Sequence, residues 1–182
     1  MDEQLEFLKL IAQRLDSAGI AYMVTGSMAM GLFAVPRMTR DIDLVVEFAS
    51  GDAERIASLF EKDCYLDLDG IRDAVARHGI FNIIHNEWII KVDFIVRKNN
   101  EYRKVEFGRR REVELSGALI SVVAPEDLIL SKLCWARDSE SQVQQDDARQ
   151  LVKSVASLDW TYLEKWADVL AVRELLDLAR AI

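Results

Sequence analysis

The pattern of apolar positions changes once along the chain, near residue 124. Before that point, short apolar runs alternate with stretches in which apolar residues recur at helical spacing, which is typical of a chain that forms strands and helices in turn. Beyond it, only the helical spacing continues. We therefore expect an α/β (α+β) core over residues 1–123 and a small C-terminal helical region over residues 124–182, packed on the core because no flexible linker separates them.

Individual elements follow from the same pattern. Gly19 and Pro36 lie where the first two helices should end, and Pro125 suits the first position of a later one. Strands are expected at residues 20–25, 41–48, 80–84, 88–96, 112–115 and 118–123. Helices are expected at residues 3–18, 28–34, 52–62, 70–78, 125–137, 142–157, 159–169 and 171–181.

Composition excludes several classes of protein. With 51% hydrophobic residues over 182 positions, the chain can bury a core, so it is not mainly disordered. Its longest apolar run, residues 20–24, is far shorter than the roughly 18–20 residues of a membrane span. The acidic start, Asp2-Glu3, is unlike a signal peptide and predicts a cytoplasmic protein. Cys64 and Cys134 lie far apart, so we expect neither a disulfide framework nor a structural zinc site.

The charge is negative overall but unevenly distributed. With 23 basic and 31 acidic residues, the net charge of −8 argues against general binding of duplex DNA. Residues 97–111, however, contain seven basic and two acidic residues. This segment has two interpretations: a contact surface for RNA or a nucleotide acceptor, or a solvated strand edge on which positive charge blocks pairing with other strands. We favour the strand edge.

Two carboxylates in a predicted strand indicate a metal site. Asp41 and Asp43 are two residues apart, so on a strand they share one face about 6.5–7 Å apart. Like charges so placed repel each other unless a cation lies between them. Hard oxygen ligands of this kind suit Mg²⁺, which commonly shares its coordination with substrate phosphates.

A glycine and a serine upstream predict a phosphate site. Gly26 allows a sharp turn and close approach of a ligand, and Ser27 can cap the helix that follows. The free N–H groups at such a helix start bind anions. A phosphate held there, beside cations at Asp41 and Asp43, is the geometry required for phosphoryl or nucleotidyl transfer.

A third carboxylate lies in a later, mostly apolar strand. Asp93 would be costly to bury without a partner. If its strand lies beside residues 41–48, Asp93 completes a cluster of three acids. It would then be either a metal ligand or the general base toward an attacking hydroxyl.

These motifs together resemble a known group of enzymes. Gly26-Ser27, the Asp41-x-Asp43 pair followed by apolar residues, and the later Asp93 resemble the signature of the DNA polymerase beta-like nucleotidyltransferase superfamily. More narrowly, the chain resembles the bacterial AbiE-type toxin nucleotidyltransferases and their uncharacterised relatives. Three segments carry this likeness: RMTRDIDL at 37–44, PEDLILSKL at 125–133 and DDARQL at 146–151.

The resemblance implies a fold, a reaction and further site residues. It implies a mixed sheet flanked by helices, two Mg²⁺ ions, and transfer of a nucleoside monophosphate from an NTP, such as ATP, to a hydroxyl. Lys132 and Asp147 match positions that help to hold the nucleotide in such relatives. A toxin–antitoxin context would add a cognate antitoxin as partner. The acceptor stays open between tRNA ends, protein hydroxyls and small molecules such as aminoglycosides.

Each of these residues also has a plainer interpretation. Lys132 is otherwise a solvated side chain and Asp147 the partner of a neighbouring arginine. Arg37 and Arg40 flank the acids and either contact the triphosphate or acceptor or are surface charges. Trp135, like the other tryptophans of the helical half, is expected in core or interface packing. For the whole chain, the alternatives are a catalytically idle binding or antitoxin-type protein with this fold, and a nuclease that uses the same acids.

Overall fold

The computed structural model describes residues 2–36, 39–49 and 51–181. Within these ranges the strands are β1 (Tyr22–Thr25), β2 (Ile42–Val46), β3 (Cys64–Leu66), β4 (Ile80–His85), β5 (Lys91–Val96), β6 (Arg111–Leu115) and β7 (Ala118–Val122). The helices are α1 (Asp2–Ser17), α2 (Gly26–Phe33), α3 (Ala53–Phe60), α4 (Leu68–Arg77), α5 (Glu101–Gly108), α6 (Pro125–Ser139), α7 (Gln142–Ser154), α8 (Trp160–Val169) and α9 (Arg173–Arg180).

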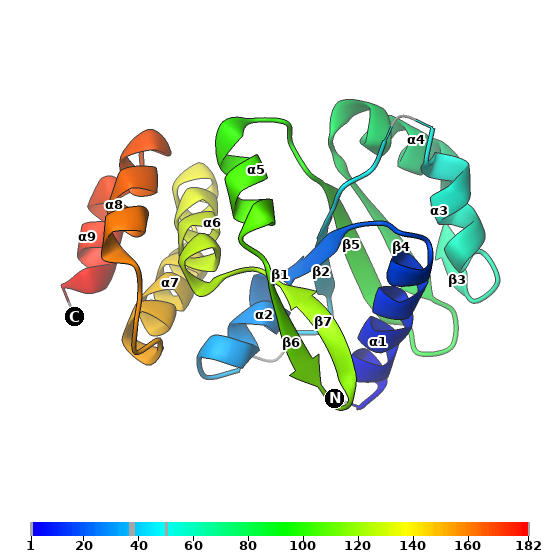
Figure 1. Ribbon diagram of the computed structural model, residues 1–182, viewed down its shortest axis with the longest axis horizontal. Helices are drawn as coiled ribbons and strands as arrows, with labels where there is room; N and C mark the ends of the chain where they lie inside the picture. Colours follow the sequence, from blue (N-terminus) through cyan, green and yellow to red (C-terminus); the bar gives the residue numbers. More distant parts are fainter. Residues whose placement is uncertain (1, 37–38, 50, 182) are drawn as a thin grey trace.

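The strands form one mixed sheet in the order β3-β4-β5-β2-β1-β7-β6. β2 runs parallel to β5 and β1 parallel to β7, whereas the other neighbours are antiparallel. The sheet crosses the middle of the molecule, with α1, α3 and α4 toward one end and α6 to α9 toward the other (Figure 1). The expected α/β architecture with a mixed sheet is confirmed.

Helical and strand periodicities bury one continuous core. On α1, Phe7, Leu8, Ile11 and Leu15 are fully buried, at the spacing of one helical face. On β5, buried and partly exposed residues alternate, so Val92, Phe94 and Val96 face the core. The opposite face of β5 therefore carries the polar side chains of the candidate site.

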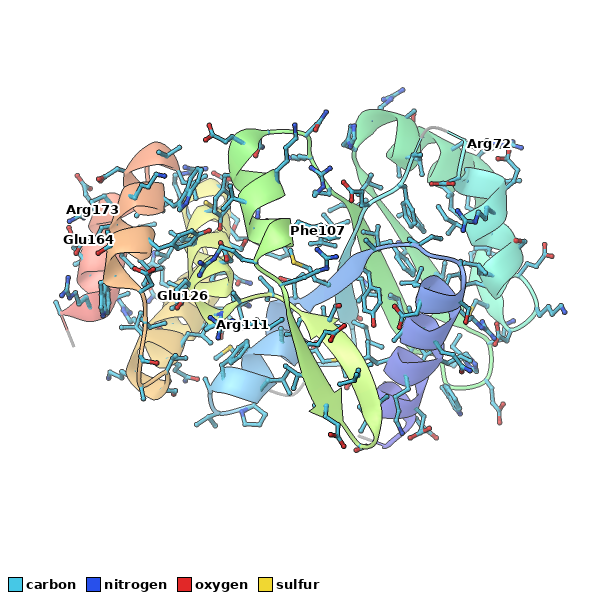
Figure 2. All side chains as sticks on the ribbon, in the orientation of Figure 1. Arg72, Phe107, Arg111, Glu126, Glu164 and Arg173 are labelled. Atoms are coloured by element: carbon cyan, nitrogen blue, oxygen red, sulfur yellow. The ribbon has the colours of Figure 1, made fainter. Side chains whose placement is uncertain are left out.

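The C-terminal helices pack on one another and on α2. α6 contacts α2, α7 and α8, and α9 contacts α7 and α8. Glu164 of α8 and Arg173 of α9 lie near each other (Figure 2), with 3.6 Å between Glu164 Oε2 and Arg173 Nη2. Among the described helices, none combines the length and apolar character that crossing a membrane requires.

Two elements differ from the sequence-based expectation. The basic segment is not mainly a strand edge: residues 101–108 form α5, whose N-cap Asn100 accepts a hydrogen bond from the Arg103 N–H at 2.9 Å. Arg109, which follows α5, binds buried acids of α6, and so does Arg111 of the edge strand β6 (Figure 2). The short strand β3 was not expected either. It pairs with β4 at the opposite edge of the sheet.

Candidate active site

Strand register brings three acids together. Asp43 of β2 lies directly between Thr25 of the antiparallel β1 and Asp93 of the parallel β5. Asp41 immediately precedes β2, on the same face as Asp43 by the two-residue period. Neighbouring strands are about 4.8 Å apart, so the three carboxylates occupy one small area of the sheet.

A lysine bridges two of these acids. The Lys91 Nζ, at the start of β5, donates a hydrogen bond to Asp93 Oδ2 at 2.8 Å and lies 3.2 Å from Asp41 Oδ2. The hydrogen bond with Asp93 and the neighbouring negative charges raise the pKa of Lys91, so its ammonium form is favoured. One fixed positive charge therefore lies among the three carboxylates.

Asp43 has no such partner among the described side chains. Its carboxylate is partly buried, and burial raises its pKa to about 6, together with the negative charges of Asp93 and Asp41. The ammonium groups of Lys132 and Lys91 oppose this increase without cancelling it. At neutral pH, Asp43 is thus a carboxylate that a divalent cation would stabilise.

The start of α2 faces Asp43 across a very short gap. Gly26 has a φ of +63°, which side chains rarely tolerate, and a Cβ on it would lie 2.7 Å from the Asp43 Cγ. Only glycine therefore lets the start of this helix approach the carboxylate so closely. Ser27 follows in the first helical turn and is buried. The helix start presents backbone N–H groups and a positive dipole end, which favour a bound anion.

Lys132 and Asp147 form a buried ion pair. The Lys132 Nζ of α6 donates to Asp147 Oδ2 of α7 at 2.7 Å, and both side chains are almost fully buried. Lys132 is therefore not a solvated side chain, and Asp147 is not limited to pairing with an arginine. The charge of Lys132 is close enough to lower the pKa of Asp43. The pair joins α6 to α7 beside the carboxylates.

A cavity of about 640 Å³ opens beside Asp43. One face of α6 forms one wall, and Trp135 lies on it with 53% of its surface exposed. Of the two expected roles of Trp135, core packing is therefore wrong, and interface packing stays a prediction. The other α6 residues of this wall are Leu128, Ser131, Lys132, Cys134 and Asp138. The remaining lining comes from the sheet, the start of α2, the end of α4 and α5: Thr25, Gly26, Val45, Arg77–Ile80, Ile95–Lys98, Arg103 and Glu106.

Hydrogen bonds hold the wall between α5 and α6. The Arg103 Nη1 donates to Glu106 Oε2 at 2.7 Å and to Ser131 Oγ at 2.9 Å. Ser131 Oγ in turn donates to Glu106 Oε1 at 2.8 Å. Burial raises the pKa of Glu106, against the effect of Arg103. Because all three polar groups are satisfied, this part of the wall is fixed in shape.

The remaining predicted residues lie outside the cavity lining. Asp41 and Asp93 are not among the described residues that line it, so these two acids border the site beyond Asp43. Arg40 is exposed on the segment before β2. Arg37 and Met38 of the sequence motif lie outside the described residues.

The acids fit Mg²⁺ only with help from a ligand. In the described part of the chain, no group of three or more His, Cys, Asp or Glu side chains is arranged to hold a metal ion. Mg²⁺, however, is usually bound through one or two carboxylates together with substrate phosphates. The unneutralised Asp43 beside the anion-binding start of α2 meets that requirement.

A comparison with models of protein families shows to which family the chain belongs. The model of the family described as "Nucleotidyl transferase AbiEii toxin, Type IV TA system" matches residues 14–153, which is more than three quarters of the chain. The chain belongs to the AbiEii family. The matched range includes the start of α2, the three acids, Lys132 and Asp147. Family and fold together make the chain a nucleotidyltransferase.

Solved structures share the fold of this AbiEii-family chain at low identity. An antigenic nucleotidyltransferase-like protein from Paracoccidioides brasiliensis is 16% identical over 99% of this chain and 93% of that one, with a TM-score of 0.61. A putative nucleotidyltransferase from Thermotoga maritima is 21% identical over 80% and 92%, with a TM-score of 0.57. ANT(2″)-Ia in complex with adenylyl-2″-tobramycin is 14% identical over 96% and 99%, with a TM-score of 0.60. No curated protein matches the chain.

Two residues of this site were not singled out as site residues from the sequence. Lys91 is two positions before Asp93, so the strand period alone places both on one face. The strand period could therefore have identified Lys91 as a site residue from the sequence. Trp135 is three positions after Lys132 and shares its helical face, but only the structure shows that this face borders a cavity.

Proposed function

We propose that this AbiEii-family chain transfers a nucleoside monophosphate from an NTP to a hydroxyl acceptor, with Mg²⁺, at Asp43. The observation that carries the proposal is the close approach of Gly26 to the Asp43 carboxylate, both of which line the cavity. It places an anion-binding helix start beside an unneutralised acid. A triphosphate with its divalent ion satisfies both groups at once.

Each group of site residues has its own role in the proposed reaction. The start of α2, with Gly26 and Ser27, binds the triphosphate, and Asp43 and Asp41 would hold the divalent ion. A bound ion supplies positive charge that offsets the charge developing on the phosphate oxygens. Lys132, kept in place by Asp147, adds a second positive charge on the cavity side. Catalysis then rests on positioning and electrostatic stabilisation, as is typical of phosphoryl transfer.

Asp93 is suited to receive the acceptor's proton. Its Oδ2 accepts a hydrogen bond from Lys91, which fixes the carboxylate, and we assign the proton to its other oxygen, Oδ1. In the transfer, the acceptor oxygen forms a bond to the α-phosphorus and the bond from that phosphorus to the pyrophosphate oxygen breaks. The hydroxyl proton passes to Asp93 Oδ1 and then to solvent. Pyrophosphate leaves with the electron pair of the broken bond.

The cavity gives the nucleoside a location. Trp135 lies one helical turn beyond Lys132 on the same face of α6, and its exposed ring borders the cavity. Nucleobases stack on such rings irrespective of sequence. We infer that the base packs on Trp135 while the phosphates lie near Gly26.

The family, rather than the site, suggests a biological role. We propose that the chain acts as the toxin of a toxin–antitoxin pair and that a cognate antitoxin is its partner. The acceptor stays open between an RNA end, a protein hydroxyl and a small molecule. An NTP substrate and two free cysteines, Cys64 and Cys134, are consistent with the cytoplasmic location expected from the sequence.

A labelling experiment tests this function. The protein is incubated with each α-³²P-labelled NTP, Mg²⁺ and total cell extract, and label is followed into RNA, protein and small molecules. We expect one fraction to be labelled by the wild type and none by Asp43→Asn. Equal labelling by the variant, or none by the wild type with any NTP, would contradict the proposal.

One observation favours a second candidate, a catalytically idle binding protein. Lys91 already neutralises part of the acid cluster, as an idle site would require. Thermal-shift titration separates the two. A nucleotidyltransferase is stabilised by NTP with Mg²⁺ far more than by either alone, because each improves binding of the other. An idle protein shows no such dependence on the pair.

A further inference from the structure

Lys91 occupies a position that a cation takes in a carboxylate cluster. Its Nζ lies 2.8 Å from Asp93 Oδ2 and 3.2 Å from Asp41 Oδ2. The side chain is only 36% exposed, so part of its stem is packed on the sheet. The ammonium is therefore a local part of the acid cluster rather than a mobile surface charge.

The sheet register explains why Lys91 reaches both acids. Ile42 pairs with Val92 in the parallel β2–β5 ladder, so the residues just before them, Asp41 and Lys91, lie beside each other. Asp93 is two residues further along β5, on the same face as Lys91. The bridge thus joins Lys91 and Asp93 of β5 to Asp41, the residue that immediately precedes β2.

The three acids are consequently unequal. Lys91 binds one oxygen of Asp41 and one of Asp93, whereas no described side chain forms a hydrogen bond or ion pair with Asp43. Within the cluster, Asp41 and Asp93 are therefore partly neutralised by Lys91, and Asp43 is not.

We propose that the Lys91 ammonium permanently takes the place of one of the two metal ions, so that the site binds a single divalent ion, together with the triphosphate, at Asp43 and Asp41. The inference deepens the proposed function and rests on it. It differs from the two-ion site that the sequence resemblance implies. Lys91 acts here as a positioning residue for Asp93 and as a fixed charge.

The distances around Lys91 indicate that its ammonium replaces a second Mg²⁺ ion and does not bind beside one. Mg²⁺ requires its oxygen ligands at about 2.0–2.1 Å in near-octahedral geometry. Both oxygens that face Lys91 are farther than this from Nζ, at ammonium hydrogen-bond distances. An ion between Asp41 and Asp93 would therefore have to expel the ammonium and draw the two carboxylates together. Lysine is suited to the substitution because its ammonium is a compact point charge with three donors.

The test counts divalent ions in the bound state. Mn²⁺ bound per chain is measured by electron paramagnetic resonance, in the presence of a saturating α,β-methylene NTP analogue that cannot be cleaved. We expect one nucleotide-dependent Mn²⁺ in the wild type and two in Lys91→Met, which keeps the stem and removes the charge. Lys91→Arg, which keeps the charge, should bind one.

Controls separate local from general effects. Lys104→Met removes an exposed lysine of α5 outside the cavity lining and should bind one Mn²⁺, like the wild type. Adding Asp93→Asn to Lys91→Met should return the count from two to one, because it removes a ligand of the second ion. Circular dichroism confirms that each variant is folded.

Each outcome has a definite meaning. Two ions in the wild type would overturn this inference and leave the proposed function standing, since the ammonium would then be expelled on binding. One ion in both the wild type and Lys91→Met would also overturn it. No nucleotide-dependent Mn²⁺ in the wild type would instead overturn the proposed function, and the inference with it.

Discussion

At the scale of single residues, the proposed function depends on Asp43, whose pKa is raised from 3.8 to about 6 by burial and by neighbouring acids. Because the folded state holds the proton more tightly than the unfolded chain, protonated Asp43 stabilises the fold. This contribution is complete below pH 4 and is lost as the pH rises through about 6. Ionised Asp43 is thus a source of instability that a bound cation removes.

Asp43→Asn should therefore change how stability depends on pH. Without divalent ions, we expect wild type and variant to unfold with similar free energies near pH 4, and the variant to be more stable by up to about 3 kcal/mol at pH 8. Urea unfolding across this pH range measures the difference. Glu61→Gln, at an exposed position, should show no such trend. A difference that does not vary with pH would contradict the account.

Gly26 should tolerate no side chain. Gly26→Ala adds a Cβ that overlaps the Asp43 carboxylate, in addition to the strain of a positive φ. Gly19→Ala is a matched control, because Gly19 has a φ of +65° and nothing within 4 Å of its Cβ position. We expect Gly19→Ala to cost roughly 1–2 kcal/mol of stability and to keep activity. Gly26→Ala should cost more and abolish transfer; equal behaviour of the two variants would show that the close contact is unimportant.

Replacing Trp135 should weaken binding of the nucleobase and leave binding of the phosphates unchanged. Loss of stacking in Trp135→Ala should weaken NTP binding by about 5- to 150-fold, the range that corresponds to 1–3 kcal/mol per base. Binding of inorganic tripolyphosphate should not change, and Trp160→Ala on α8 should affect neither ligand. Calorimetry with both ligands measures this. An equal loss of tripolyphosphate affinity in Trp135→Ala would refute the assigned location of the base.

At the scale of elements, most of the fold could be predicted because most elements bury a periodic apolar face. α1 and β5 are examples, with helical and alternating patterns respectively. α5 was missed because one of its buried positions is Glu106, which is paired with Arg103, so the apolar period is hidden by charge. β3 was missed because it has three residues and depends on pairing with β4.

Part of the candidate site, like most of the fold, could be predicted from the sequence. Strand period and spacing indicated Asp41, Asp43 and Asp93, and the register brings them together. The sequence did not reveal which acids are neutralised, because that depends on whether Lys91 reaches across to β2. The cavity was also invisible, since it arises where α5 and α6 meet the ends of strands distant in sequence.

The α6–α7 contact provides a prediction at this scale. Lys132→Met removes the buried ion pair between Lys132 and Asp147 and should cost about 3–5 kcal/mol of stability. The double variant Lys132→Met/Asp147→Leu should recover much of that stability, because both buried charges are gone. If Lys132 also holds the nucleotide, the double variant stays inactive. Recovery of transfer together with stability would limit Lys132 to a structural role; urea unfolding and the labelling assay measure both.

At the scale of the whole molecule, one arrangement links the sheet and the C-terminal helices. The sheet places the acids in neighbouring positions on adjacent strands, and α6 supplies one wall of the cavity beside Asp43. Arg109, after α5, binds Asp127 of α6 at 2.9 Å, and Tyr162 of α8 donates to the same carboxylate at 2.5 Å. These partly buried contacts join α6, which carries Lys132, to the residue that follows α5 and to α8.

The most direct test of a nucleotidyl transfer at Asp43 compares two labels on one NTP. With the purified protein, Mg²⁺ and the acceptor fraction, label from the α-phosphate should become attached to the acceptor, and label from the γ-phosphate should be released as pyrophosphate. Asp43→Asn should do neither. Attachment of the γ label, or transfer of the α label by Asp43→Asn at the wild-type rate, would contradict the account.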